Sequence, residues 1–432
     1  MTWQVVHLVM ANVLLVTVLV LVVLRPRGLD FAWSAGIGAL VAIVLGLLPL
    51  ASLITIFHDT WDATVTLISL FLLSQTLDSN GFFSWAALLL ARFARGSGWR
   101  LYGLTLLLTL AVVALLANDG AVLMLTPIFA QLLKKIYPHE ASRLPYLFAV
   151  GLFADAMSII FIPSNLTNII IADANQLSFL HFAAWMVVPT LAAFLVGGGA
   201  FALRFRQQMH VSYNVEVLAE PKSVIVDRLV FWIGWGALGS LAVGYIVGSE
   251  LHLPFSLISG PITLVMLVIT QVRGLSSAKK MLLKAPWNIL IYALGMFVVI
   301  TAGYDTGVLA FLTHPLVGYV RSGSLSALLA GTILAVLSAA VNNLPATLIG
   351  VLVLRSTKQI SQIAIYALVI GVNIGPKFTP FGSLATLLWL RILKDHNIHI
   401  SWGTYVRENW WVVLLTLSAA FGGLLIANLF IK

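Results

Sequence analysis

A lysine, Lys377, stands in the middle of an apolar segment that runs from residue 361 to residue 391. A bilayer crossing needs about 20 apolar residues, so this segment is long enough to span a membrane and still be interrupted. Pro376, Pro380 and Gly382 flank the lysine, and a continuous helix disfavours such a run. A lysine at the centre of a bilayer costs about 2.5–3.5 kcal/mol and is normally paired or faces water. The segment therefore predicts a helix broken at mid-membrane, which is typical of a transporter binding site.

Three other apolar segments, at residues 101–135, 145–171 and 323–356, are also interrupted by polar residues near their middle. In lipid every backbone polar group needs a partner, so such breaks survive only where they meet protein or water. We therefore expect the four breaks to converge near the midplane, where amides, hydroxyls and the N-termini of half-length helices would line a cavity. The candidate substrate-binding residues at the breaks are Asn118, Asp119, Gly120, Ser164, Asn165, Thr167, Asn168, Asn342, Asn343, Gly382, Ser383 and Thr386.

Asp119 and Asp155 are acids within these apolar segments, and Lys377 is their natural counter-charge. In one interpretation an acid carries a proton while the lysine competes for the carboxylate. In the other interpretation an acid and the lysine form a static ion pair that holds a hairpin in place. We assign proton coupling to Asp119, Asp155 and Lys377. Asp119 is the first choice for the carrier, because a hairpin tip is where substrate and proton can exclude each other.

The composition predicts the architecture that must position these residues. Of the 432 residues, 60% are hydrophobic and 9% are charged, which indicates an all-α polytopic membrane protein. We expect two repeats of five spans, at residues 1–203 and 229–432, joined by a cytoplasmic linker at residues 204–228. Because five is an odd number, the second repeat is inverted relative to the first, as in many secondary transporters.

Each repeat is expected to contain a re-entrant hairpin and a broken helix besides its simple spans. The hairpins are residues 101–135 and 323–356, and the broken helices are residues 145–171 and 361–391. A twelve-crossing alternative counts the arms of the hairpins as spans. The simple spans are expected at about residues 3–24, 31–50, 61–80, 183–203, 229–248, 255–272, 286–304 and 409–431.

The basic residues predict the orientation of the chain in the membrane. With both termini in the periplasm, the side chains that fall outside are Arg321, Arg355, Lys358 and Lys432, and Lys377 lies within the membrane. The rest of the 24 lysines and arginines then lie on the cytoplasmic side, as the positive-inside rule requires. The net charge of +9 therefore reflects membrane topology, and we expect no nucleic-acid partner.

Several classes of chemistry lack the residues that they need. The chain has no cysteine, so thiolate metal sites and thiol catalysis are excluded. It contains no H-E-x-x-H metal motif, no G-x-x-x-x-G-K-[ST] nucleotide loop and no G-x-S-x-G nucleophile motif. We therefore expect no enzymatic activity and no cofactor, and we predict a secondary transporter embedded in a lipid bilayer.

The motifs at the breaks resemble those of the ArsB family, the arsenical pump membrane proteins of the ion-transporter superfamily. The resemblance covers nearly the whole chain and is most specific in the run GPKFTPFGSLATLLWL (375–390). The other matching runs are GFFSWAALLLARF (81–93), ANDGAVLMLTPI (117–128), FIPSNLTNI (161–169), APWNILIYALGM (285–296), NNLPATLIG (342–350) and ISWGTYVR (400–407).

This resemblance implies arsenical resistance through export of arsenite and antimonite across the bacterial inner membrane, in exchange for protons and sometimes with a soluble partner ATPase. Without cysteine the chain cannot hold arsenic as a thiolate complex, so the substrate would be the neutral trihydroxide As(OH)3. The alternative is a proton-coupled carrier of an organic or inorganic anion. A dicarboxylate would need two positive anchors, and Lys377 is the one lysine expected within the membrane. A passive channel is a further alternative, which would conduct without any coupling to pH.

Overall fold

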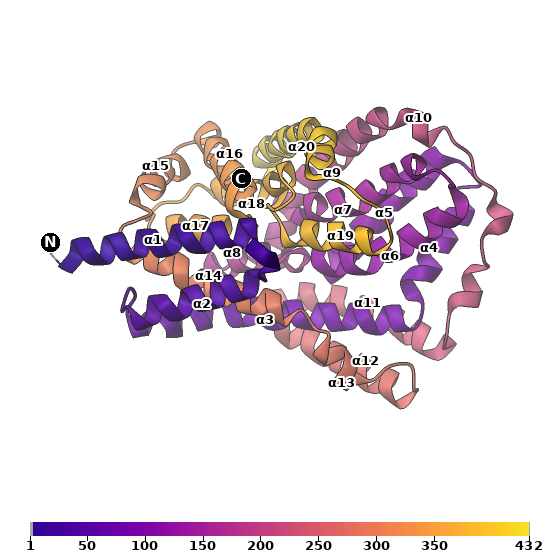
Figure 1. The fold of residues 1–432 in the computed structure, drawn as a ribbon, viewed down its shortest axis with the longest axis horizontal. Coiled ribbons are helices and arrows are strands. Elements are labelled where there is room, and N and C mark those ends of the chain that lie inside the picture. Colours follow the sequence, from indigo (N-terminus) through magenta and orange to yellow (C-terminus); the bar gives the residue numbers. More distant parts are fainter. Residues whose placement is uncertain (1–2, 432) are drawn as a thin grey trace.

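The regular secondary structure between residues 3 and 431, the range that the computed structural model describes, is entirely helical (Figure 1). The first half contains α1 (Trp3–Leu24), α2 (Phe31–Val44), α3 (Leu50–Ser79), α4 (Phe82–Phe93), α5 (Gly98–Leu116), α6 (Asn118–Ile136), α7 (Leu144–Met157), α8 (Leu166–Ala174), α9 (Phe179–Arg204) and α10 (Arg206–Met209). The second half contains α11 (Arg228–Glu250), α12 (Phe255–Val272), α13 (Ala278–Leu283), α14 (Trp287–Asp305), α15 (Ala310–Arg321), α16 (Ser324–Val341), α17 (Asn343–Arg355), α18 (Gln362–Ile374), α19 (Leu384–Asp395) and α20 (Trp402–Phe430).

Within residues 3–431, nine helices are long and apolar enough to cross a membrane by their length and composition. Their outer faces carry exposed apolar side chains such as Val243, Val272 and Leu325. Lipid tails solvate such side chains, whereas water would disfavour so many of them on long helices. The chain therefore forms an all-α, multi-pass membrane protein.

Two helices begin earlier than the hydropathy pattern predicts. Helix α3 begins at Leu50 and not at about residue 61, and α20 begins at Trp402 and not at about residue 409. The additional turns carry charged side chains, which the pattern treats as loop residues. In the structure Asp59 and Glu408 each pair with an arginine, at 2.5 and 2.7 Å. Because the partners come from distant segments, the hydropathy of these segments alone does not reveal them.

The helices of the two halves make corresponding contacts. Helix α2 packs against α14 as α12 packs against α3, while α9 and α20 pack against each other. Within the halves, the contact of α5 with α7 corresponds to that of α16 with α18, and the contact of α6 with α19 corresponds to that of α17 with α8. Gly81 and Gly307 follow α3 and α14 and have similar φ angles of 78° and 83°. An inverted repeat would produce this exchange of contacts, and the repeat itself stays a prediction.

Small residues let α18 approach α16 closely. A Cβ atom at Gly371 would overlap the carbonyl oxygen of Gly331, and one at Gly375 would lie 2.5 Å from the carbonyl oxygen of Ala335. Backbone contact of this kind is typical of helices that pack in membranes. It holds the C-terminal end of α18 in place, and with it the segment that carries Lys377.

The connection between the halves, residues 205–227, lies on α4 as a strap (right side of Figure 1). Arg92 of α4 donates a hydrogen bond of 2.7 Å to the carbonyl oxygen of Leu218. The hydroxyl of Tyr213 donates in turn to the carbonyl oxygen of Ala91. The strap is ordered because α4 satisfies part of its backbone and polar groups.

We expect Gly81→Ala to destabilise the protein more than Gly307→Ala. Both glycines have a left-handed backbone, in which an L residue costs about 1–2 kcal/mol. At Gly81 the added Cβ atom would also overlap the carbonyl oxygen of Val224 in the strap, whereas at Gly307 it would meet no atom within 4 Å. Thermal unfolding of the detergent-purified variants compares the two, and equal decreases in Tm would show that the strap does not constrain Gly81.

Candidate functional site

Lys377 forms a buried ion pair at the break between α18 and α19. After α18 the chain forms a short 3-10 helix, η7 (Gly375–Phe378), which carries Lys377 in the protein interior. Its ammonium nitrogen lies 2.5 Å from Oδ2 of Asp155 on α7, and the two side chains are 0% and 1% exposed. The same nitrogen donates to the carbonyl oxygen of Gly151 (3.1 Å) and to the hydroxyl of Thr386 (2.6 Å). All three N–H groups therefore have partners, which offsets much of the cost of burying the charge.

Asp155 also accepts hydrogen bonds from the other breaks. The hydroxyl of Ser383, the residue before α19, donates to Oδ2 at 2.6 Å. The side-chain amide of Asn118, the first residue of α6, donates to Oδ1. One carboxylate on α7 thus joins the first hairpin, α5–α6, to both broken helices, α7–α8 and α18–α19.

Asn373, near the end of α18, joins the two broken helices a second time. Its side-chain oxygen accepts hydrogen bonds from Asn165 (2.6 Å), Thr167 (3.1 Å) and Ser158 (3.3 Å). Its side-chain nitrogen donates to Oδ1 of Asn168 at 2.9 Å. The amide is therefore fully hydrogen-bonded in a buried position, which makes this junction rigid.

The two hairpin tips have the same unusual backbone. Ala117 and Asn342, the residues before α6 and α17, have φ angles of 63° and 89° with extended ψ, which L residues rarely adopt. The backbone N–H of Asn343 donates to the carbonyl oxygen of Gly382 at 2.8 Å, so the second tip is tied to the second broken helix. The hydroxyl of Tyr292 on α14 donates to Oδ1 of Asn342 at 3.2 Å.

Four short helices, α6, α8, α17 and α19, begin at the breaks, and we refer to them as half-helices. The first residues of all four line one cavity of about 20 Å³, the central cavity. Because helix N-termini carry partial positive charge and free N–H groups, this arrangement favours oxygen-rich ligands. The volume holds about one water molecule, so the half-helices are closed around the cavity. Its polar lining consists of Asn118, Asp119, Asn165, Thr167, Tyr292, Asn343 and Ser383.

Asp119 lines the central cavity in the first turn of α6 and is 9% exposed. No side chain within residues 3–431 forms an ion pair or a hydrogen bond with its carboxylate. The nearby cation, Lys377, is instead occupied by Asp155. The two membrane acids therefore differ: Asp155 is held by partners, whereas Asp119 faces the central cavity.

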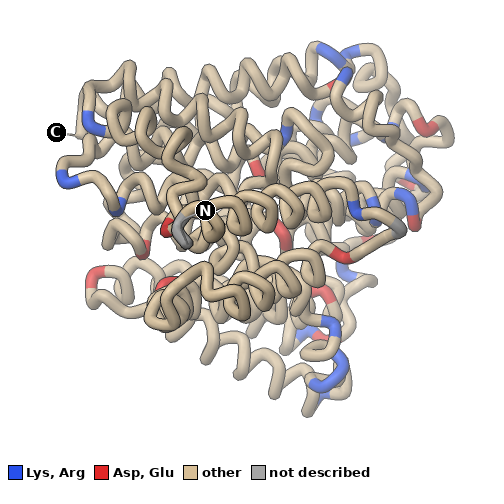
Figure 2. The backbone as a smooth tube through the Cα atoms, turned by 60° about the vertical axis from the view of Figure 1, so that its left-hand side comes forward, with Lys and Arg blue, Asp and Glu red and all other residues tan. Residues whose placement is uncertain are grey.

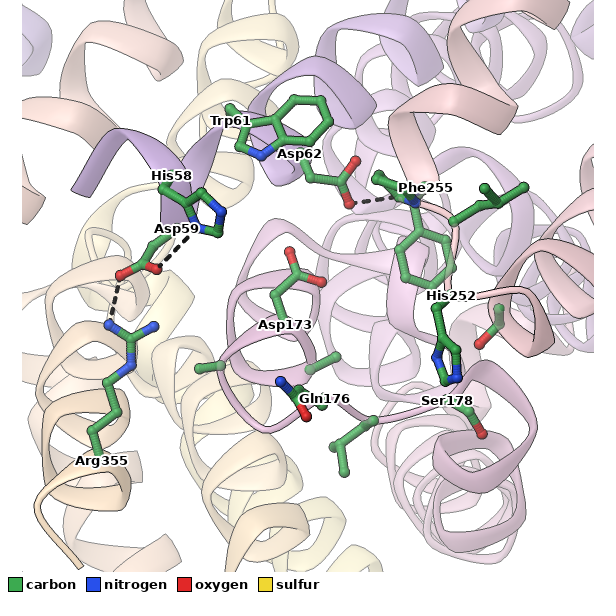
Figure 3. A pocket seen from close by; sticks show the side chains of 16 residues that line it. His58, Asp59, Trp61, Asp62, Asp173, Gln176, Ser178, His252, Phe255 and Arg355 are labelled. Carbon is green, nitrogen blue, oxygen red and sulfur yellow. Dashed lines mark hydrogen bonds and ion pairs between the residues drawn. The ribbon is translucent and has the colours of Figure 1, made fainter. Parts of the chain in front are cut away.

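A larger cavity of about 640 Å³, the large cavity, lies at the far end of two half-helices (Figure 3). Helix α8 leads from the central cavity to Asp173, whose side chain points into the large cavity. Helix α17 leads from Asn343 to Arg355 on the wall, where Arg355 pairs with Asp59 of α3 at 2.5 Å. Helices α6 and α19 lie on the opposite side of the centre from α17 (Figure 1). One pair of half-helices thus leads from the central cavity in each direction.

The structure places the sequence-predicted site residues in two groups. Those that line the central cavity are Asn118, Asp119, Asn165, Thr167, Asn343 and Ser383. Those that contact neighbouring segments instead are Gly120 (beside Ser74), Ser164 (donating to the carbonyl oxygen of Ala114), Asn168 (bonded to Asn373), Asn342 (bonded to Tyr292), Gly382 (accepting from Asn343), Thr386 and Asp155 (both bonded to Lys377).

Sequence reasoning missed Tyr292 as a residue of the site. Tyr292 belongs to an apolar helix, and a tyrosine O–H that is buried in such surroundings usually finds a hydrogen-bond partner. That requirement, applied to the tyrosine in residues 285–296, was the available signal.

Comparisons with known proteins agree over almost the whole chain. The sequence model of the family described as "Arsenical pump membrane protein", ArsB, matches residues 10–428. A protein of Yersinia enterocolitica with the same description is 37% identical over 418 residues, which cover 96% of this chain and 97% of that protein. A protein of Escherichia coli K12, described in the same words, is 36% identical with the same coverage. A "putative arsenical pump membrane protein" of Bacillus subtilis is 29% identical over 423 residues, covering 92% of this chain and 94% of that protein.

A solved structure shares the fold of this chain. It is the crystal structure of the YdaH transporter of Alcanivorax borkumensis, which was reported to have an unusual topology. The TM-score is 0.51, and the alignment covers 88% of each chain at 16% sequence identity. At this identity the likeness concerns the arrangement of the helices alone.

We expect Lys377→Met to destabilise the protein strongly, because it leaves the Asp155 carboxylate buried without its counter-charge. Breaking a buried pair by removing one partner costs about 3–5 kcal/mol. The double variant Asp155→Asn/Lys377→Met leaves no buried charge and should recover much of that loss. Yield and monodispersity on size-exclusion chromatography compare the proteins, and a single variant as stable as the double variant would contradict the role of the pair.

Proposed function

Because the chain belongs to the ArsB family of arsenical pump membrane proteins, we propose that it exports arsenite and antimonite from the bacterial cytoplasm in exchange for protons. Membership in this family makes the chain a membrane transporter of arsenicals and not an enzyme. We further propose the chemical form of the substrate, the driving ion and the route. Export of arsenicals would give the cell arsenical resistance.

The lining of the central cavity is the observation that supports a neutral substrate. Its amide and hydroxyl groups can donate and accept hydrogen bonds, which suits the hydroxyl groups of As(OH)3 and its antimony counterpart. The chain has no cysteine, so a thiolate complex of arsenic is unavailable. Recognition by hydrogen bonds around a small polyol is therefore the mode that these residues favour.

An anion carrier is the rival function, and the distribution of charge disfavours it. The described residues that line the central cavity include Asp119 but neither lysine nor arginine. The ammonium of Lys377 lies behind the lining and is neutralised by Asp155 at 2.5 Å. An anion would therefore meet a like charge and no free positive anchor in a region of low dielectric constant.

The central cavity must widen before a trihydroxide can enter, and we propose that it opens alternately along the two pairs of half-helices. Helices α8 and α17 lead to the large cavity. Most lysines and arginines gather at the opposite end, on the right side of Figure 2. This end would be cytoplasmic by the positive-inside rule, and the large cavity and both termini periplasmic. Lys432, one of the four basic residues predicted to be periplasmic, lies outside the described residues.

Export of a neutral molecule against its gradient needs a driving ion, and we propose that Asp119 binds it as a proton. The Asp119 carboxylate lines the cavity that would hold the substrate, so a proton and a bound substrate compete for the same carboxylate. One proton moving inward gains about 2.3 kcal/mol for each 100 mV of membrane potential. Asp155 would keep Lys377 neutralised throughout the cycle, which makes that pair the structural partner of the carrier.

Everted vesicles with an imposed proton gradient test this function. We expect the protein to accumulate arsenite and antimonite, and Asp119→Asn to abolish gradient-driven uptake because an amide takes up no proton near neutral pH. Arsenite exchange without a gradient should persist in Asp119→Asn, since the cavity keeps its shape and its hydrogen bonds.

The matched control is the double variant Asp155→Asn/Lys377→Met, in which the other membrane acid is neutralised without leaving Lys377 as an unpaired buried charge. Loss of coupling in this double variant together with normal coupling in Asp119→Asn would reverse the assignment. Coupled transport in both variants would contradict a mechanism based on membrane acids, and uptake of an anion in place of arsenite would favour the rival function.

Single cysteines test the inverted repeat and its orientation, because the native chain has no cysteine to label. Lys135 lies in the last turn of α6, and Lys358 follows the C-terminal end of α17. We expect Lys135→Cys to react with a membrane-impermeant maleimide only in everted vesicles, and Lys358→Cys only in spheroplasts. Reaction of both from the same side would contradict the inverted repeat.

A further inference from the structure

Tyr292 of α14 lines the central cavity and lies outside the four half-helices. Its side chain is completely buried and lines the cavity, and its hydroxyl donates to Asn342 at the second hairpin tip at 3.2 Å. It is the aromatic residue in the lining of the central cavity. The other polar residues of the lining lie in the half-helices or, like Asn165 and Ser383, directly before them. A phenol in this position can hydrogen-bond a hydroxyl of the substrate and block its path with the ring.

A column of two side chains holds the ring of Tyr292 from behind. The ring of Phe31 meets it edge to face, with 5.2 Å between centroids and an interplanar angle of 86°. The guanidinium carbon of Arg25 lies 4.8 Å from the centroid of Phe31. Aromatic pairs and cation–π contacts of this kind add stabilisation beyond the burial of the rings. The column therefore favours one position of the Tyr292 ring.

Arg25 shows that this column is more than ordinary packing. Its backbone has a φ of 47°, in the left-handed region that non-glycine residues seldom occupy. Its Nε and one terminal nitrogen are buried and have no hydrogen-bond partner. A guanidinium normally finds partners for its N–H groups, so a strained and under-bonded arginine on the ring of Phe31 indicates a function.

Helices α2 and α14 hold the column together. Asn288 of α14 donates to Oδ2 of Asp30 at 2.8 Å, and Asp30 also caps the N-terminus of α2. At Gly295 a Cβ atom would lie 2.7 Å from the carbonyl oxygen of Ala35, so the two backbones are in contact. Phe31, the first residue of α2, and Tyr292 on α14 are thus placed by a close helix pair and not by a loop.

The corresponding place in the other half carries a smaller side chain. Counting back from Gly81 and Gly307, the predicted repeat aligns Tyr292 with Thr66 on α3. Phe255 begins α12 as Phe31 begins α2, and it lines the large cavity. The half with the small threonine is therefore the one whose corresponding phenylalanine lines the large cavity, whereas Tyr292 occupies the equivalent place in the other half.

We propose that Tyr292 is a further substrate-contacting residue, and that Phe31 and Arg25 are positioning residues that hold its ring across the cytoplasmic side of the central cavity. This inference rests on the proposed export function. The Tyr292 hydroxyl leaves Asn342 and bonds a hydroxyl of the trihydroxide as the substrate enters. The column then returns the ring to its closed position behind the substrate.

Tyr292→Phe tests the contact, because it keeps the ring and removes only the hydroxyl. We expect the KM for arsenite in everted vesicles to rise about 5- to 30-fold, the effect of one lost hydrogen bond in a buried site, with a maximal rate close to that of the unmodified protein. Tyr366→Phe is the matched control, since Tyr366 is also a fully buried tyrosine but does not line the central cavity. An unchanged KM in Tyr292→Phe, or an equal change in the control, would overturn the contact.

Phe31→Leu tests the positioning role by a measurement that needs no transport. A single cysteine at Asn343, which lines the central cavity, reports access from the cytoplasmic side through its reaction with an impermeant maleimide in everted vesicles. We expect Phe31→Leu to raise this rate about 2- to 10-fold, the range set by the strength of one aromatic pair. Arg25→Gln, which keeps the aromatic pair, should raise it in the same direction.

Phe231→Leu is the control for packing, because Phe231 forms a similar edge-to-face pair with Trp85 at 5.0 Å and does not line the central cavity. Unchanged labelling in both Phe31→Leu and Arg25→Gln, or an equal increase in Phe231→Leu, would overturn the positioning role. Faster labelling in Phe31→Leu, found in a protein that does not take up arsenite into everted vesicles, would contradict the proposed substrate while supporting the barrier.

Discussion

The buried ion pair between Asp155 and Lys377 is the interaction on which the centre of this protein depends. An unpaired charge inside a membrane protein is strongly unfavourable, so each partner requires the other to be in place. The carboxylate also accepts hydrogen bonds from Asn118 and Ser383, and the ammonium donates one to Thr386. A single pair of charges therefore holds a hairpin tip and two broken helices in one arrangement. The second hairpin tip is joined to them separately, through the hydrogen bond from the backbone N–H of Asn343 to Gly382.

The pair also determines what the central cavity can recognise. Because the positive charge is neutralised within the protein wall, the cavity presents dipoles, hydroxyls and one acid. Under the proposed function, a small neutral polyol would gain a hydrogen bond from these groups, whereas an anion would find no free counter-charge. Selectivity would then follow from the pairing of Lys377 with Asp155 as well as from the groups that line the cavity.

Sequence patterns predicted the breaks because unpaired polar groups have an unfavourable free energy in lipid. Polar residues and prolines within apolar segments need internal partners, so their positions alone indicated the segments that meet. The predicted starts of α3 and α20 were wrong, because these helices begin earlier, at Leu50 and Trp402. Their added turns contain Asp59 and Glu408, whose arginine partners lie far away in the chain. The choice between Asp119 and Asp155 as partner of Lys377 was open for the same reason. Each of these questions depends on contacts between distant segments, which the pattern within one segment does not contain.

The small volume of the central cavity has a consequence for proton conduction. A space that holds about one water molecule cannot contain a continuous file of water from one side of the membrane to the other. Without a continuous file of water molecules, protons cannot be transferred from one side of the membrane to the other while the half-helices are closed. The closed form described here would therefore not conduct protons across the membrane that contains it.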